Sequence, residues 1–191
     1  MFARTPRLLL RPGWIEDAAA LAQAIGDAAV LRNLTRAPAP YDMGEARAFL
    51  SMPQRPLAPR LLAFTRTRGA PRLVGGCGIH LDEAGAPELG FWIARAYWGL
   101  GFATEAARAV MGMARAGGLP AVRAAHFMDN PASGRVLRKI GFRCTGRIEK
   151  RFSAARGGEA DCLLFEEGAA PAGALDPAMD NDAARFPALA A

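Results

Sequence analysis

A glycine-rich turn between a strand and a helix carries the clearest chemical signal in this sequence. The turn, Gly99-Leu-Gly-Phe-Ala-Thr104, follows an apolar strand-like run from Glu88 to Ala94. Glycine has no Cβ, so its backbone takes tight conformations and lets a ligand approach closely. The helix that begins after Gly101 starts with amide N–H groups that have no partner inside the helix. Together with the positive end of the helix dipole, these donors predict a binding site for a phosphate group.

Three other interpretations of this turn are a dinucleotide site, a Walker-type phosphate loop and a purely structural turn. The turn partly matches the dinucleotide fingerprint G-x-G-x-x-G, which requires a parallel strand–helix–strand unit and an acidic residue about 20 positions later. Here the preceding strands read as hairpins, and the region Gly117 to Ala121 contains no acid. A Walker-type loop is excluded because no Gly-Lys-Ser/Thr follows. A purely structural turn that only lets a helix pack on a sheet stays as an alternative.

Composition favours an anionic partner and does not indicate metal chemistry. The formal net charge is +6 and the isoelectric point is about 10.0, which suits phosphorylated cofactors, nucleic acid or acidic protein. Cys77, Cys144 and Cys162 are widely spaced, so we expect free thiols and no zinc site. His80 and His126 lie in predicted strands and not at metal-ligand spacing. No signal-type N-terminus or bilayer-length apolar run occurs, so we expect a cytoplasmic protein without a membrane partner.

Periodicity and turn residues predict the elements that must position the turn. We predict strands at residues 7–11, 61–67, 72–81, 88–94, 121–128, 143–151 and 161–166. We predict helices at residues 15–25, 28–34, 43–52, 102–116 and 131–140. Short turns join the three central strands, which predicts antiparallel hairpins and an α+β domain with a mostly antiparallel sheet. The domain is expected to span residues 1–167, followed by a mobile Ala/Pro-rich tail at residues 168–191.

Two segments resemble motifs of the GNAT N-acetyltransferases. Trp98-Gly-Leu-Gly-Phe-Ala103 is similar to the acetyl-CoA motif R/Q-x-x-G-x-G/A, with Trp98 in place of the usual Arg or Gln. Asn130-Pro-Ala-Ser-Gly-Arg-Val-Leu-Arg-Lys-Ile-Gly-Phe142 resembles the N-x-x-S-x-x-V-L-x-K-x-G-F segment of the ribosomal-protein N-terminal (alanine or serine) acetyltransferases. The resemblance covers roughly residues 6 to 166. It implies the acyl-CoA N-acyltransferase fold, a central mixed and mostly antiparallel sheet flanked by helices.

The resemblance also implies where acetyl-CoA would bind. The pantetheine arm would pair with strand backbone where two central strands diverge, at Trp92, Ile93 and Ala94. The pyrophosphate would lie on the backbone of the turn, formed by Gly99, Leu100, Gly101, Phe102, Ala103 and Thr104. Physical chemistry independently supports that second placement, since the turn is a helix N-terminus. Glu105 would repel a pyrophosphate, so its side chain is expected to face away.

The helix after Asn130 would supply further cofactor contacts. By the resemblance, Asn130 would contact the cofactor arm, although an Asn at this position would equally cap the helix. Ser133 lies one turn further on and is also compatible with an ordinary exposed helix serine. Arg135 and Arg138 would pair with the adenosine phosphates of CoA. Acetyl-CoA is the expected cofactor, and no metal is expected.

Acetyl transfer to an amine requires a deprotonated amine, a polarised carbonyl and a proton for the departing thiolate. Glu88 is the first candidate base, because it begins the strand that the resemblance places beside the thioester and burial would raise its pKa. A structural pairing of Glu88 with an arginine is the alternative, and Asp129 and Asp161 are weaker candidate bases. The tyrosine that many family members use as the acid is replaced by Leu137. Ser133 or a water molecule would then donate the proton to the departing thiolate.

We therefore expect an N-acetyltransferase in which a primary amine attacks acetyl-CoA directly in a ternary complex. The acceptor could be a protein N-terminus or a small molecule such as an aminoglycoside, a polyamine or an amino acid. Ribosome association and a homodimer are compatible with this assignment. Two rivals are a non-catalytic acyl-CoA-binding module and an RNA-associated protein. The second would use a basic segment that could equally be a solvated face, Arg135, Arg138, Lys139, Arg143, Arg147, Lys150, Arg151 and Arg156.

Overall fold

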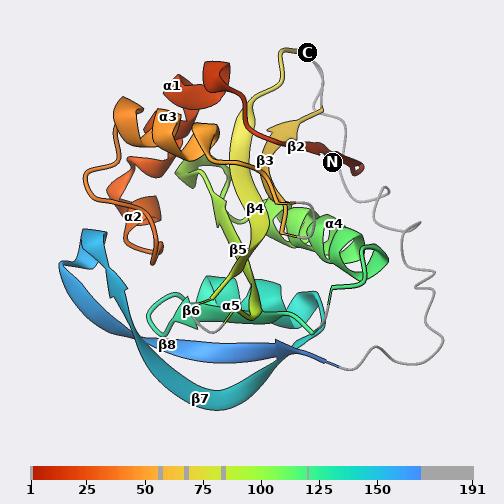
Figure 1. The fold of residues 1–191 in the computed structure, drawn as a ribbon, viewed down its shortest axis with the longest axis vertical. Coiled ribbons are helices and arrows are strands. Elements are labelled where there is room, and N and C mark those ends of the chain that lie inside the picture. The colour runs from red at the N-terminus through yellow and green to blue at the C-terminus, as the bar shows by residue number, and fades with distance from the viewer. Residues whose placement is uncertain (1, 56–57, 67–68, 83–84, 120, 169–191) are drawn as a thin grey trace, which may run out of the picture.

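The computed structural model describes residues 2–55, 58–66, 69–82, 85–119 and 121–168, which are organised around one sheet (Figure 1). The strands follow one another across the sheet in the order β1-β2-β3-β4-β5-β6-β8-β7. Only β5 and β6 pair in parallel; the other neighbouring strands are antiparallel. The strand bounds are β1 Ala3–Arg4, β2 Leu8–Arg11, β3 Arg60–Thr65, β4 Leu73–Leu81, β5 Pro87–Ile93, β6 Arg123–Phe127, β7 Phe142–Ser153 and β8 Gly158–Glu167. The predicted mixed, mostly antiparallel sheet is therefore confirmed.

Helices cover both faces of this sheet. Figure 1 shows α1, α2 and α3 on one side of the central strands and α4 on the other. Their bounds are α1 Ala18–Ile25, α2 Ala28–Leu31, α3 Met43–Ser51, α4 Phe102–Ala116 and α5 Pro131–Lys139. The side chains of Asp27, Asp42 and Asn130 accept bonds from the first backbone N–H groups of α2, α3 and α5. These caps satisfy donors that a helix cannot pair internally and so set where each helix begins.

The alternation of side chains along β3 separates two hydrophobic cores. Leu61 and Ala63 are buried in the core that includes α4, whereas Leu62 and Phe64 are buried in the core that includes α1 and α3. Successive side chains of a strand point to opposite faces, so an unbroken apolar run such as Leu61 to Phe64 contributes side chains to both cores. The result is three layers, with the sheet in the middle.

The two parallel strands separate soon after they meet. Their pairing comprises only Glu88 with Arg123 and Leu89 with Ala124. On its other edge β5 stays paired with β4 along its whole length, and Ala94 N still donates to Val74 O. In an antiparallel pair, alternate residues turn their backbone groups toward the partner strand. The backbone groups of Phe91 and Ile93 therefore face the opening between β5 and β6.

The predicted element order is correct, and the differences lie at boundaries. A short strand, β1, precedes the predicted first one, and the helix expected at residues 15–25 begins as a 3₁₀ turn, Ile15–Asp17, before α1. β7 and β8 are longer than predicted, because most side chains of β7 are exposed and give no apolar alternation. The predicted tail lies outside the described residues beyond Gly168. Within the described part of the chain, no helix is long and apolar enough to cross a membrane.

Candidate active site

The glycine turn has the conformation that its sequence predicts. Gly99 and Gly101 have φ values of 78° and 80°, in the left-handed region that residues with a Cβ rarely adopt. Gly101 is the N-cap of α4, so the first backbone N–H groups of Phe102, Ala103 and Thr104 begin the helix. Helix geometry leaves such N–H groups without an intrahelical partner, and they point out of the helix end. This geometry suits an anion at the turn.

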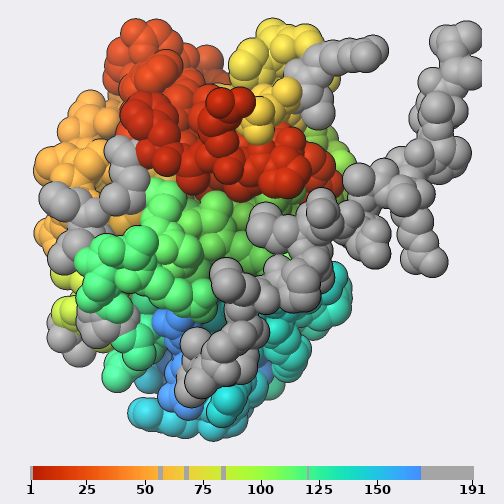
Figure 2. Space-filling view, turned by 90° about the vertical axis from the view of Figure 1, so that its right-hand side faces the viewer, coloured from red at the N-terminus to blue at the C-terminus, as the bar shows by residue number. Residues whose placement is uncertain are grey.

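Arg7 of the N-terminal segment contacts the residues of this turn and of the first turn of α4. Its Nη1 donates to Leu100 O over 2.9 Å, its Nε donates to Glu105 Oε2 over 2.7 Å, and its guanidinium lies 4.6 Å from the ring centroid of Phe102. Figure 2 shows the N-terminal residues (red) lying against the green region that contains α4. Glu105 also accepts a bond from Thr5 Oγ1. Glu105 therefore faces β1 and β2, which confirms the expectation that it faces away from the anion site.

A cavity of about 540 Å³ opens in front of the turn. Its wall comes from α2 and the residues after it, the end of β5, the glycine turn, and the start of α5. Three basic side chains, Arg32, Arg135 and Lys139, and one acidic side chain, Asp129, are among its lining residues. Most of the predicted cofactor residues line it, namely Trp92, Ile93, Gly99, Gly101, Phe102, Ala103, Thr104, Asn130, Ser133 and Arg135. The excess of positive charge suits a phosphorylated ligand.

The open edge of β5 differs in detail from the prediction. Phe91 and Ile93 face the opening, whereas the backbone groups of Trp92 and Ala94 face β4. The carbonyl of Ile93 already accepts a bond from Trp98 Nε1 over 2.6 Å. Trp98 is the residue that departs from the family motif, and its indole ties the turn to the end of β5. The backbone groups that remain for an extended ligand are the N–H and C=O of Phe91 and the N–H of Ile93.

Three predicted cofactor residues lie outside the cavity wall. Ala94 donates to Val74 O, Leu100 O accepts from Arg7, and the guanidinium of Arg138 lies 5.5 Å from the ring centroid of Phe165. Arg138 is one position before Lys139, which does line the cavity. A helix turns about 100° per residue, so adjacent residues face different directions. Arg138 therefore faces away from this cavity, whereas Lys139 lines it, and a contact between Arg138 and the cofactor stays a prediction.

Asn130 and Ser133 interact with each other at the start of α5. Asn130 Oδ1 accepts from Ser133 N, and Asn130 Nδ2 donates to Ser133 Oγ over 3.1 Å. The capping interpretation of Asn130 is therefore confirmed. Because the serine oxygen is already an acceptor for Asn130, its own O–H stays free to donate. Ser133 is thus a hydroxyl donor held at a fixed place on the cavity wall.

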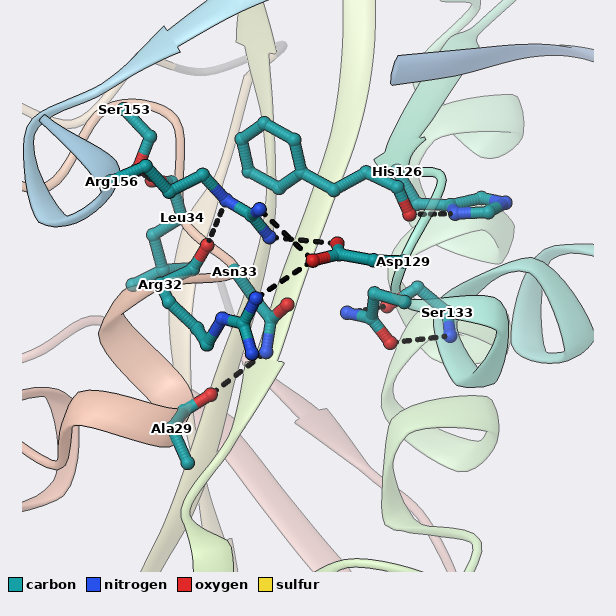
Figure 3. Close-up of polar contacts among 11 residues, drawn as sticks. Ala29, Arg32, Asn33, Leu34, His126, Asp129, Ser133, Ser153 and Arg156 are labelled. Carbon is teal, nitrogen blue, oxygen red and sulfur yellow. Dashed lines mark hydrogen bonds and ion pairs between the residues drawn. The ribbon is translucent and has the colours of Figure 1, made fainter. Parts of the chain in front are cut away.

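An ionic cluster links three chain segments beside this serine (Figure 3). The carboxylate of Asp129 accepts bonds from both terminal nitrogens of Arg156, over 3.0 and 2.8 Å, and from Arg32 Nη2 over 2.8 Å. Arg156 Nε also donates to Arg32 O, and Ser153 Oγ donates to Leu34 O. The bonds from Arg156 lower the pKa of Asp129. Asp129 is therefore a structural anion, which makes it a poor base, and Asp161 lines neither cavity.

A second cavity of about 470 Å³ meets the first. Six residues line both cavities, namely Asn33, Leu34, Phe91, Trp92, Asn130 and Ser133. The second cavity extends from there between α3 and the strands β4 and β5, where Tyr41, Phe49 and Leu62 give it apolar walls. The buried hydroxyl of Tyr41 has no hydrogen-bond partner among the described residues, and burial raises its pKa to about 12. The hydroxyl is therefore a neutral donor for a ligand or a water.

Glu88 lines this second cavity, and its pKa is shifted in the direction opposite to the prediction. It is 5% exposed, its carboxylate accepts from Arg151 Nη1 and Nη2 over 2.6 and 2.8 Å, and His80 Nε2 lies 3.4 Å from Oε1. Burial by itself would raise the pKa of Glu88, but the neighbouring His80 and Arg151 lower it to about 2. The expected rise is wrong. A carboxylate with such a low pKa is a weak proton acceptor at neutral pH.

The pairing of Glu88 should appear in the acid stability of the protein. A carboxyl whose pKa is about 2 in the folded protein, against 4.5 for an unpaired glutamate, stabilises the fold above pH 4.5 and loses that contribution as the pH falls toward 2. The shift corresponds to about 3 kcal/mol. We expect denaturant unfolding to show this loss between pH 5 and pH 2 in the wild type. Glu88→Gln should be less stable at pH 6 and lack this part of the pH dependence; parallel curves for the two proteins would contradict the assignment.

Sequence reasoning missed several residues of these cavities. His80 was detectable, because residues 80 and 88 are equally distant from the centre of the β4–β5 turn and so pair across the hairpin. Arg151 and the residues that follow α2, Arg32 and Asn33, carried no such signal, since they reach the site from distant parts of the chain. No cluster of metal-ligating side chains occurs in the part of the chain described.

Comparison with known proteins identifies the family. Residues 7–143 match the acetyltransferase (GNAT) domain family, a match that spans the glycine turn, β5, β6 and α5. The chain belongs to the GNAT acetyltransferases. It is accordingly an acyl-CoA-dependent acetyltransferase, and the resemblance based on the two sequence motifs is confirmed.

Individual relatives agree with the family assignment. An N-acetyltransferase named p20 from Bacillus licheniformis is 27% identical over 166 residues, which cover 84% of this chain and 92% of that protein. The structure of a GNAT acetyltransferase from Bacillus anthracis is similar with a TM-score of 0.72 and 23% identity, covering 87% of this chain and 97% of that one. The ribosomal L7/L12 α-N-protein acetyltransferase RimL, in complex with coenzyme A, has a TM-score of 0.70 and 20% identity, with 87% and 97% coverage. At these identities the two structures show a shared GNAT fold.

Proposed function

We propose that this protein transfers the acetyl group of acetyl-CoA to a primary amine by direct attack in a ternary complex. One observation carries the proposal. Two cavities meet at Trp92, Asn130 and Ser133; the first has the glycine turn and three basic side chains against one acidic one, whereas the second has three arginines against two glutamates. A donor and an acceptor could therefore occupy separate cavities and react where these meet. A binding module for acyl-CoA would need the first cavity alone.

The first cavity is assigned to acetyl-CoA. Its phosphates would lie at the N-terminus of α4, where N–H groups and the helix dipole favour an anion. The pantetheine arm would run along the open edge of β5, where Phe91 and Ile93 offer backbone groups. RimL, whose fold this chain shares, has been solved with coenzyme A, which supports the assignment. When bound, the cofactor supplies a thioester carbonyl that an amine can attack.

Ser133 is assigned as the acid that protonates the departing thiolate. Its hydroxyl is oriented by Asn130, keeps a free proton, and lies on the wall that both cavities share. No tyrosine occupies α5, where Leu137 is buried in the core. Ser133 thus takes the role that the sequence left open between a serine and a water.

The acceptor is proposed to be a primary amine, with a protein N-terminus as the first candidate. The name of RimL describes an enzyme that acetylates a protein α-amine, and the shared fold supports this candidate for the present chain. The second cavity contains three arginines, Arg36, Arg60 and Arg151, against two glutamates, Glu45 and Glu88. That balance disfavours polycations such as polyamines and aminoglycosides, because like charges repel in a partly buried site.

Turnover with a panel of amines tests this function. The panel contains N-terminal peptides, free amino acids, a polyamine and an aminoglycoside, and release of free CoA from acetyl-CoA is measured with and without each amine. We expect release to require both the protein and a monoamine. Tight acetyl-CoA binding without release by any amine would favour the binding module. A salt-dependent RNA complex that survives charge reversal near Gly101 would favour the RNA-associated alternative.

Arg135 and Arg138 provide a matched pair for testing the cofactor cavity. Arg135 lines the cavity and Arg138 does not, although both are exposed arginines of α5. We expect Arg135→Ala to weaken CoA binding about three- to tenfold, the effect of one exposed charge-assisted contact, and Arg138→Ala to change it less than twofold. Calorimetry with CoA and dephospho-CoA measures both effects. An equal loss in the two variants would show that the contribution is general surface charge.

A further inference from the structure

His80 and Glu88 form a side-chain pair across the β4–β5 hairpin. The two residues occupy opposite register positions, and both line the second cavity. His80 Nε2 is buried and lies 3.4 Å from Glu88 Oε1, an electrostatic contact that lacks hydrogen-bond geometry in this structure. Arg151 binds both oxygens of Glu88 and keeps this carboxylate ionised and fixed. A fixed carboxylate beside one ring nitrogen favours the tautomer that carries its hydrogen on that nitrogen.

The other edge of the His80 ring faces a space that has no side chain. Gly90 lies on the same face of β5 as Glu88, two residues further along. A Cβ at Gly90 would lie 3.4 Å from His80 Cε1 and 3.5 Å from Nδ1, so even the smallest side chain would contact this edge. Because Gly90 and His80 both line the second cavity, the space that glycine leaves belongs to the acceptor side. The Nδ1 edge of His80 therefore borders the cavity in which the acceptor is proposed to bind.

We propose that His80 is the general base that takes the proton of the acceptor amine, and that Glu88 and Arg151 position it. The inference rests on the proposed function, because it assigns a residue to that reaction. An imidazole changes charge near neutral pH and can be both a proton acceptor and a proton donor to water there. Glu88 cannot fill this role, since its partners hold it as a stable anion. Its task is to orient His80.

With these roles, every proton and bonding electron pair in the reaction is accounted for. His80 Nδ1 takes one proton from the protonated amine and later releases it to solvent. The nitrogen lone pair forms the bond to the thioester carbon, the carbon–sulfur bond breaks, and sulfur leaves with the electron pair. Ser133 gives its proton to that sulfur and regains one from solvent, while the nitrogen loses its second proton to solvent. The products are the amide, free CoA and one proton.

Several ionisable groups lie around His80 in the second cavity. Glu88 on β5 and Arg151 on β7 contact one another beside it, and Cys162 on β8 lines the same cavity. The same cavity is also lined by Arg36, Tyr41, Glu45 and Arg60. The test therefore compares variants at several pH values and does not rely on a single rate.

The experiment uses the full chain and the best amine of the panel. We expect His80→Gln to lower kcat about 10²- to 10⁴-fold at pH 7, the usual cost of losing a general base, with the affinity for acetyl-CoA unchanged. The deficit should shrink at high pH, where free amine is abundant. Added imidazole should restore part of the activity of His80→Ala, which a merely structural role would not produce. His126→Gln, which removes the other histidine, should show no response to imidazole.

The outcomes separate this inference from the proposed function. A wild type that acetylates no amine would overturn both. A wild type that acetylates an amine, with His80→Gln within about threefold of it at pH 7, would overturn His80 alone. If His80 variants do not fold, Gly90→Ala keeps His80 and fills the space beside its Nδ1, and we expect kcat/KM for the amine to fall at least tenfold with acetyl-CoA binding unchanged. An unaffected Gly90→Ala enzyme would also overturn the inference.

Discussion

Gly101→Val should abolish acetyl-CoA binding in a protein that still folds. Gly101 has a φ of 80°, which a β-branched residue avoids, so valine would force the turn to change its backbone. A Cβ there would also lie 3.4 Å from Nη2 of Arg7, the residue that holds the turn. The N–H groups at the start of α4 would then no longer point at one common place. We expect calorimetry to show at least a hundredfold loss of affinity.

Gly118→Val is the matched control for this experiment. Gly118 has a φ of 74°, lies beyond the other end of α4 and has nothing within 4 Å of an added Cβ. Its valine variant should suffer similar backbone strain, about 1–3 kcal/mol, and bind acetyl-CoA like the wild type. Unchanged affinity in a folded Gly101→Val protein would remove the acetyl-CoA assignment from this turn. Equal losses in both variants would attribute the effect to stability.

Ser133→Ala should lower kcat about 10²- to 10⁴-fold, the range expected for loss of a general acid or base. The serine hydroxyl is the free donor on the wall shared by both cavities, and alanine removes it with little change in shape. Acetyl-CoA affinity should change little, because Asn130 Oδ1 can still cap the backbone N–H of residue 133. Steady-state kinetics with the best amine, and calorimetry with acetyl-CoA, measure the two quantities.

Two further variants sharpen the serine experiment. Ser133→Thr retains the hydroxyl and should retain more activity than Ser133→Ala. Ser51→Ala removes an exposed serine hydroxyl that donates to Arg47 O in α3, and it should behave like the wild type. A Ser133→Ala enzyme within about threefold of the wild type would assign the proton for the thiolate to a water.

The local parts of the site were predictable because they depend on neighbouring residues. Left-handed glycines, a helix start and an Asn cap are properties of short segments, so the turn from Gly99 to Thr104 and the start of α5 could be read from spacing. Hairpin turns likewise set the register of the central strands, and that register pairs His80 with Glu88. The two family motifs lie within these local parts, which is why the family was recognisable.

The tertiary structure decided the electrostatics and the shape of the site. Glu88 and Arg151 are 63 residues apart in the sequence, and the tertiary structure brings the guanidinium to the carboxylate. Burial alone would raise the pKa of Glu88, whereas His80 and Arg151 together lower it, so a prediction from its strand position had the wrong sign. Similarly, Asp129 meets Arg32 from a segment 97 residues away and is an ion-pair partner. Sequence spacing determined the backbone of this site. Charges interact through space, so long-range packing alone determined which of its side chains can move a proton.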